Sequence, residues 1–207
     1  MAKESGNTRT KNGGFKEGDS NFNGKITGVQ SLKAIKNKKI YSEVGGAIGR
    51  FHSVLGVRQR EIKLANLPIT TLGVHVTENG QSAGIFLNRK VFNSKDSTTQ
   101  SIVNIVKGGY ESGFTTKTNK PIAHVVTHEL AHATWNEHLT TEKAKQASGE
   151  IYGLFKQFKK DKSKKDYGRY AHSDVGEFFA EVCTKAVHGN SDKYTTRIKQ
   201  IIKKYNL

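Results

Sequence analysis

Cysteine, methionine, proline and long apolar runs are scarce in this chain of 207 residues, which has one cysteine, one methionine and two prolines. The single Cys183 rules out an intramolecular disulfide and fits a reducing setting, where we expect a buried structural thiol rather than a nucleophile. No run of eighteen apolar residues is present, which excludes a membrane-spanning helix. No long apolar run follows the early Lys3, so we expect no signal peptide and a cytoplasmic setting.

Acidic residues are also scarce, because 18 Asp and Glu stand against 34 Lys and Arg, which gives a formal net charge of +16. Such an excess favours nucleic acid or another anionic partner. Seven of the basic residues fall between 156 and 169. No interleaved aromatic residues and no nucleic-acid-binding motif accompany them, so this stretch is expected to be a solvated loop.

Large apolar residues are nearly missing from residues 1–24, where five glycines and many polar residues surround Phe15 and Phe22. This composition buries too little apolar surface to offset the entropy of ordering, so we predict a flexible, basic and glycine-rich tail. The remaining length suits a single domain. We divide this domain, 25–207, into a helical lead-in at 25–58, a core at 59–190 and a C-terminal helix at 191–207.

Periodicity and turn signals predict an α+β fold. Alternating residues predict strands at 60–65, 72–76 and 84–87, and the Asn-Gly pair at 79–80 predicts a tight hairpin. Helical patterns predict one or two helices within 31–55, the second at 42–55, and further helices at 97–107, 142–159 and 192–204. Two more helices are expected to begin at Pro121 and after the N-cap Asp174. Strands that precede most of the helices are typical of a small N-terminal mixed sheet followed by C-terminal helices.

The segment His128-Glu129-Leu130-Ala131-His132 carries the clearest chemical signal. On a helix, two imidazoles four residues apart lie on one face, where both can bind a single zinc ion. Glu129 is turned away from that face and can take the proton of an activated water as a general base. The apolar stripe that starts at Ile122 should sink the opposite side of this helix into a core.

Two histidines leave a catalytic zinc site one protein ligand short, and three downstream residues compete for the place. His138 has the metzincin spacing, but Trp135 replaces the glycine of that pattern and no methionine lies downstream, so His138 is expected at the surface. Asp166 lies in a weak aspzincin-like string. Glu177 follows the N-cap Asp174, and Glu181 on the same helical face could fix the tautomer of a ligand histidine. We favour Glu177.

The chain resembles the catalytic domain of anthrax lethal factor and related metallopeptidase-like domains of phage head-associated and polymorphic-toxin proteins. The resemblance rests on His128–His132, the Tyr167-Gly168-Arg169 string, and Glu177–Glu181, with 44 residues between His132 and Glu177. It covers about residues 60–190 and implies a zincin fold of the gluzincin type. It further implies His128, His132 and Glu177 as Zn²⁺ ligands, Glu129 as the base and Glu181 behind the ligands.

The resemblance also implies a tyrosine that stabilises the developing oxyanion. Spacing from Glu177 favours Tyr170, whereas the Tyr-Gly-Arg string favours Tyr167, and we prefer Tyr170 because reach depends on spacing from the helix. The edge strand that would align a bound peptide is expected within 84–88.

Three classes of function remain after these considerations. The leading prediction is a zinc-dependent endopeptidase that acts on a peptide or protein substrate. The alternative is a phage head-associated structural or DNA-associated protein, and thus virion-associated, in which the zincin domain has vestigial or assembly-restricted activity. A basic nucleic-acid-binding protein with a structural metal is the third, and an intact Glu129 argues against it because a structural zinc site has no use for a base.

Overall fold

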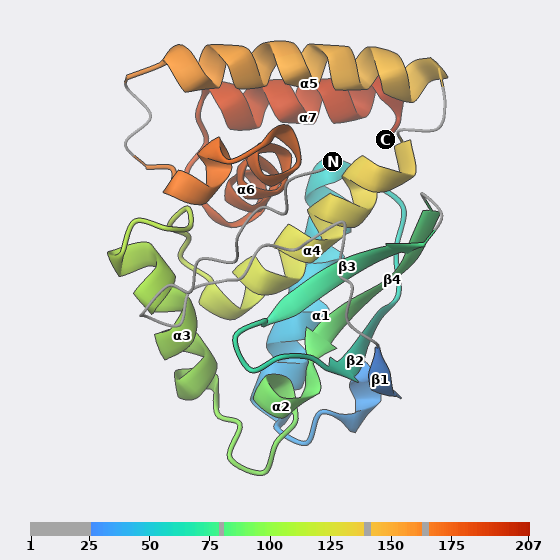
Figure 1. Ribbon diagram of the computed structural model, residues 1–207, viewed down its shortest axis with the longest axis vertical. Helices are drawn as coiled ribbons and strands as arrows, with labels where there is room; N and C mark the ends of the chain where they lie inside the picture. Colours follow the sequence, from blue (N-terminus) through green and yellow to red (C-terminus); the bar gives the residue numbers. More distant parts are fainter. Residues whose placement is uncertain (1–25, 79–80, 139–141, 163–165) are drawn as a thin grey trace, which may run out of the picture.

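A computed structural model describes residues 26–78, 81–138, 142–162 and 166–207 of the chain (Figure 1). The described part is α+β and contains a four-stranded mixed sheet and seven α-helices. The strands are β1 (Thr27–Ser31), β2 (Ile62–Asn66), β3 (Gly73–Glu78) and β4 (Gln81–Asn88). The helices are α1 (Lys38–Leu55), α2 (Arg89–Phe92), α3 (Thr99–Glu111), α4 (Pro121–His138), α5 (Glu142–Lys160), α6 (Val175–His188) and α7 (Lys193–Tyr205), with short 3-10 helices at Leu32–Ala34 (η1) and Arg169–His172 (η2).

The sheet has the strand order β1-β2-β4-β3, so β3 and not β4 forms the edge near the helices. The prediction of an edge strand within 84–88 is therefore wrong. Strand β4 pairs in parallel with β2 and antiparallel with β3. Its side chains explain this central place: Ile85 and Leu87 enter the main core, whereas Phe86 packs in a second cluster on the opposite face. Apolar residues on both faces are typical of an interior strand.

The lead-in at 25–58 is only partly helical, which corrects the prediction for this region. Residues 27–31 form β1, antiparallel to β2. All five of its side chains are exposed, so the sequence there has no alternation of apolar and polar residues. Helix α1 begins four residues before the predicted Ser42, because the Asn37 side chain accepts hydrogen bonds from the backbone of Lys39 and Ile40 and caps the helix. It ends, as predicted, before Gly56, whose φ is 71°.

The remaining helices match the sequence more closely. Helix α3 starts at Thr99 because Thr98 and Ser101 form a capping box, rather than at Asp96 or Ser97. The short α2, capped by Asn88, was not expected. Helices α4, α5, α6 and α7 lie where periodicity and caps placed them, with Asp174 and Asp192 as the N-caps of α6 and α7.

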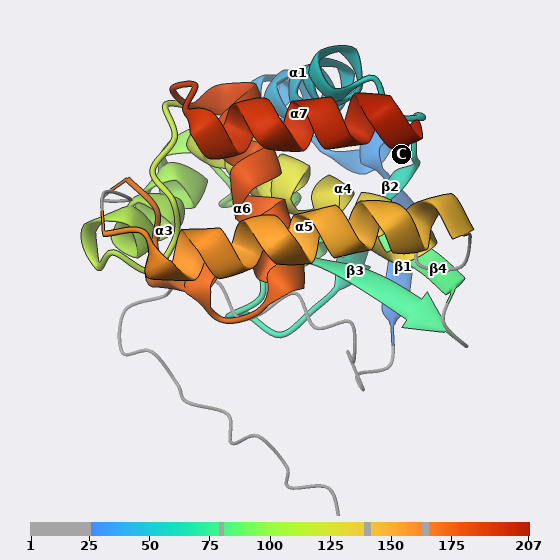
Figure 2. The same ribbon diagram turned by 90° about the horizontal axis from the view of Figure 1, so that it is seen from above.

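Helix α4 is the centre of the molecule. It packs on α1, α3 and α6 and against β3 and β4, and every residue from Ile122 to Thr134 is buried. The predicted apolar stripe therefore describes only one side of a helix that is enclosed all round. Helices α5 and α7 form a further layer over α6, and Figure 2 shows them side by side across it.

Some sequence predictions fall on residues outside the described ranges. The tail predicted at 1–24 and the turn residues Asn79 and Gly80 are among them, although β3 and β4 do pair as a hairpin up to Glu78 and Gln81. Within the described ranges, no helix is both long enough and apolar enough to cross a membrane.

Candidate metal centre

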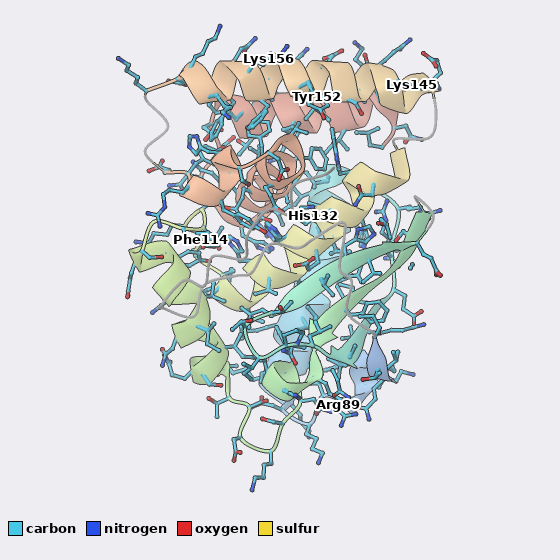
Figure 3. The ribbon with its side chains drawn as sticks, viewed as in Figure 1. Arg89, Phe114, His132, Lys145, Tyr152 and Lys156 are labelled. Carbon is cyan, nitrogen blue, oxygen red and sulfur yellow. The ribbon has the colours of Figure 1, made fainter. Side chains whose placement is uncertain are left out.

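Three side chains from two distant segments meet between α4 and α6. The Nε2 atoms of His128 and His132 lie 3.1 Å apart, and the Oε2 atom of Glu177 lies 3.1 Å from the first and 3.2 Å from the second. All three residues are buried, with 2 to 6% of their surface exposed. Figure 3 shows His132 on α4 directly beneath α6. The structure thus brings together the three residues that the sequence proposed as ligands.

Local structure fixes this meeting point. One turn of α4 separates His128 from His132, so their rings point to the same side. Glu177 lies in the first turn of α6, where its backbone N–H donates to the N-cap carboxylate of Asp174. Gly176 of the same turn lies against Trp135 of α4, which holds the start of α6 close to the histidine helix. The carboxylate of Glu177 is therefore positioned by the capped N-terminus of a helix rather than by a loop.

The spacing of the three atoms fits a metal ion. Tetrahedral zinc with bonds of 2.0–2.1 Å separates neighbouring ligand atoms by about 3.3 Å, close to the observed triangle. The Nδ1 atom of His128 faces Glu181 Oε1 at 3.1 Å. If that carboxylate accepts the Nδ1 proton, neutral His128 turns the lone pair of Nε2 toward Glu177, and either a proton on Nε2 or a metal cation between the two atoms removes the repulsion. These buried His and Glu groups can hold a metal ion.

A second group of buried ligating atoms comprises His124, His128 and Glu181. Glu181 Oε1 lies 3.4 Å from His124 Nε2, and Oε2 accepts the backbone N–H of Thr116 at 2.6 Å. Sequence reasoning gave His124 no role, although it lies one turn before His128. The signal that could have revealed the contact of His124 is a shared spacing of four residues. This spacing separates the histidines at 124, 128 and 132 and also the carboxylates at 177 and 181.

The electrostatics of the site follow from these contacts. Burial alone lowers the pKa of His128, but hydrogen bonds and charge from Glu177 and Glu181 outweigh it and raise that pKa well above its ordinary value. Burial raises the pKa of Glu177, and the opposing charge of His132 and His128 brings it down to about 2. The pKa of Glu181 is also held well below its usual range by His124 and His128, against the effect of burial. Both carboxylates are therefore ionised and favour a cation beside them.

Glu129 lies on a different side of α4, against the edge strand β3. It is 2% exposed, and a Cβ atom on Gly73 would lie 2.8 Å from its Cγ. A hydrogen bond from the backbone of His75 reaches the carboxylate, whereas its Oε2 has no hydrogen-bond partner in the described part of the chain. Burial raises the pKa of Glu129, partly offset by the neighbouring histidines. A carboxylate with a raised pKa and a free oxygen has the properties of a proton acceptor.

The two tyrosines of the 166–173 segment have different surroundings. The Tyr170 ring stacks on His128, with centroids 5.6 Å apart and planes at 11°, and on Phe114 at 4.9 Å. The Tyr167 hydroxyl donates instead to Asp192 at 2.9 Å, and Lys185 Nζ lies 4.2 Å from its ring centroid. The structure places Tyr170, and not Tyr167, against His128 of the candidate metal centre.

Gly168 explains how Tyr170 reaches this position. A Cβ atom at this residue would lie 2.2 Å from the carbonyl oxygen of Phe114, so only glycine allows the two backbones to approach. Hydrogen bonds from Arg169 N to Gly113 O and from Tyr170 N to Phe114 O then join the segments. The Tyr-Gly-Arg string thus supplies close backbone packing.

Of the two rejected ligand candidates, Asp166 does not belong to the centre. Asp166 has a side chain that is 79% exposed and lies 3.6 Å from Lys185 Nζ. The side chain of His138 lies outside the described atoms.

Buried histidines and carboxylates at metal-ligand spacing define a candidate metal centre within an α+β domain, and the buried Glu129 of α4 packs beside them against an edge strand. Comparison with known protein families, with characterised proteins and with solved structures finds no match for this chain.

Proposed function

We propose that the protein is a zinc-dependent endopeptidase of the zincin type. The observation that carries the proposal is the triangle of His128 Nε2, His132 Nε2 and Glu177 Oε2, with sides of 3.1 to 3.2 Å, next to the buried Glu129. Three protein ligands and one open position are what a catalytic zinc site requires, whereas structural sites close with a fourth protein ligand. The donor set therefore supports zinc, held by His128, His132 and Glu177.

Zinc in this position would polarise the scissile carbonyl and acidify a water molecule. Glu129 takes the proton of the attacking water and later gives it to the departing amine, a transfer that its raised pKa favours. Glu181 keeps the proton on His128 Nδ1, so that Nε2 stays free as a ligand atom. We assign to Tyr170, whose ring stacks on His128, the donation of a hydrogen bond to the developing oxyanion.

The sheet supplies a place for the substrate backbone. Strand β3 lies at the edge of the sheet, antiparallel to β4, and its Gly73 contacts Glu129. An extended peptide that pairs with the open side of β3 would pass next to the base. We propose β3 for this role in place of the segment 84–88.

The proposal is tested by replacing the base without changing the ligands. Glu129→Gln keeps the shape of the side chain but cannot take a proton, so it should retain about one zinc per chain and lose at least 100-fold in hydrolysis of a peptide library. Glu111→Gln changes an exposed carboxylate at the end of α3 and should keep full activity. Full activity in Glu129→Gln, or metal-free wild-type protein after purification with added zinc, would refute the proposal.

A further inference from the structure

His188, the last residue of α6, has no role in the proposed centre and an unusual environment. Its side chain is only 5% exposed, yet neither ring nitrogen has a hydrogen-bond partner among the described residues. Buried polar atoms are nearly always paired, so an imidazole with two unpaired nitrogens indicates a missing partner. His188 lies eleven residues after Glu177 on the same helix, about 16 Å along its axis, so this partner is not the metal of the first centre.

Two cavities meet at His188. The larger, of about 490 Å³, lies between the segment 110–119 and the end of α6, and the smaller, of about 360 Å³, lies between α1 and the start of α4. His188, Asn119 and Gly189 line both cavities. Each volume is in the range of small-molecule sites, and the shared wall makes them two parts of one site.

The smaller cavity offers several features that attract an anion. Arg50 and Lys120 line it, opposed by the single acid Glu43. Ala123 belongs to the first turn of α4, an 18-residue helix whose first backbone N–H groups lack partners within the helix and carry its positive dipole end. The surroundings act on His188 itself: burial lowers its pKa most, and the charges of Arg50, His124 and Lys120 lower it further, to about 4. His188 is thus neutral at pH 7 in a positive environment, and can donate one hydrogen bond and accept another.

The C-terminal carbonyl groups of α6 would oppose an anion, but two of them, Lys185 O and Val187 O, already accept hydrogen bonds. Arg50 Nε donates to Val187 O at 2.8 Å, and Gly189 N donates to Lys185 O at 2.7 Å. Among the side chains that line the two cavities, Lys185 is already paired with Asp192 at 2.9 Å and with Asp166 at 3.6 Å. The remaining cationic residues of the lining are Arg50, Lys117 and Lys120, and the remaining acid is Glu43, so this part of the site has an excess of positive charge that suits a dianion.

The larger cavity can take an organic group attached to the anion. Two tyrosines, Tyr110 and Tyr167, and the hydroxyl or amide side chains of Thr115, Thr118 and Asn190 line it. Aromatic walls with a few hydrogen-bonding groups are typical of sites for organic ligands.

We propose that the two cavities around His188 form a binding site for a phosphate monoester. The phosphate lies in the smaller cavity against His188, Arg50, Lys120 and the start of α4, and the organic group lies in the larger cavity.

Calorimetry with three probes that share one ring tests this proposal. Phenyl phosphate should bind once per chain and at least tenfold more tightly than benzoate, which carries a single negative charge, and benzyl alcohol should not bind. Each titration is run on zinc-loaded and on chelator-treated protein, because a phosphate could also bind zinc. Binding that persists without metal supports the site at His188 whatever the fate of the proposed peptidase, and binding that disappears with the metal overturns it.

Variants locate the bound phosphate. Lys120→Met removes an exposed charge at the cavity and should weaken phenyl phosphate binding at least fivefold, whereas Lys143→Met removes an exposed charge on α5 and should leave it unchanged. His188→Gln, which keeps hydrogen-bonding groups, should weaken binding less than His188→Phe, with circular dichroism to verify folding. Equal loss in both lysine variants would show general charge attraction, and no binding by wild-type protein would show that solvent alone fills the cavities. Either result overturns the proposal.

Discussion

Each histidine of α4 meets carboxylate oxygens according to its place along the helix. His132 contacts Glu177, His124 contacts Glu181, and His128 lies between them and contacts both. A central imidazole held from both sides has its ring plane and its tautomer fixed. His128 is therefore the residue on which the geometry of the centre depends most.

Replacement of the carboxylate ligand should release the metal. Glu177→Ala leaves two imidazoles without their anionic partner, so we expect metal retention after gel filtration to fall at least tenfold, measured by elemental analysis. His138→Ala should retain about one equivalent, because the metzincin pattern is broken at Trp135. The opposite order of metal loss would restore the metzincin hypothesis.

Gly73 makes room for the base and should be sensitive to a single methyl group. In Gly73→Ala the new Cβ would lie 2.8 Å from Glu129 Cγ and 3.2 Å from its Oε1, so the carboxylate must move. Misplaced catalytic groups lose about 100-fold in rate, and we expect a loss of this order in kcat/KM with metal content unchanged. Gly46→Ala, where a Cβ meets no atom within 4 Å, is the matched control and should leave kcat/KM unaltered. Wild-type activity in Gly73→Ala would show that Glu129 is not held by this contact.

The sequence sufficed to choose most residues of the centre and failed at one. The i, i+4 spacing of His128 and His132 and the capped start of α6 follow from local rules, so His128, Glu129, His132 and Glu177 could be selected. The contact between His124 and Glu181 depends on how α4 and α6 cross. The periodicity of side chains within one helix does not reveal the angle at which two helices cross.

At the scale of elements, the segment 166–173 gives different surroundings to the two tyrosines on which the two sequence criteria disagreed. Its backbone hydrogen bonds to 113–114 turn Tyr170 toward His128, and the same course leaves Tyr167 beneath α7. The residue chosen by spacing from α6, Tyr170, thus lies against His128, and its role in catalysis stays a prediction.

We predict opposite effects for the two hydroxyl deletions. Tyr170→Phe should lower kcat by about 10²–10³, the usual loss for one oxyanion donor, with unchanged metal content. Tyr167→Phe should keep kcat and lower the free energy of unfolding by about 1 kcal/mol, because it loses the hydrogen bond to Asp192. Peptide kinetics and urea unfolding of both variants measure the two effects. A larger kcat loss in Tyr167→Phe would reverse the assignment.

The strands were harder to predict than the helices. Helices α4 to α7 carry caps and periodic apolar residues within their own sequence, and these signals are local. Strand β1 has no buried side chain, and its pairing with β2 joins residues more than thirty positions apart. The position of β3 at the edge likewise depends on which strand of the β3–β4 hairpin pairs with β2. Long-range pairing of this kind has no marker in a single sequence.

For the whole molecule, His188 should make stability depend on pH. In the unfolded chain its imidazole takes up a proton as pH falls through about 6.5, whereas the folded protein delays this until pH is about 4. The unfolded state therefore binds more protons in this interval, and the stability that is full above pH 6.5 is lost progressively down to pH 4.

His188→Gln does not titrate and should lose less unfolding free energy than wild type between pH 7 and pH 4.5. Urea unfolding in chelator and without phosphate measures the difference, since metal release is then the same for both proteins. If the free energies of unfolding of wild type and His188→Gln change in parallel with pH, His188 titrates normally in the folded state.

The enclosure of α4 has a kinetic consequence for metal exchange. Side chains that are 2 to 6% exposed can release a bound ion completely only when α4 and α6 separate, even though the open coordination position admits water or a small chelator. Complete release then waits for a local opening whose frequency is set by the protein and not by the reagent. Removal of a bound ion should accordingly reach a constant maximal speed as more chelator is added, and the occupied and empty forms should interconvert slowly.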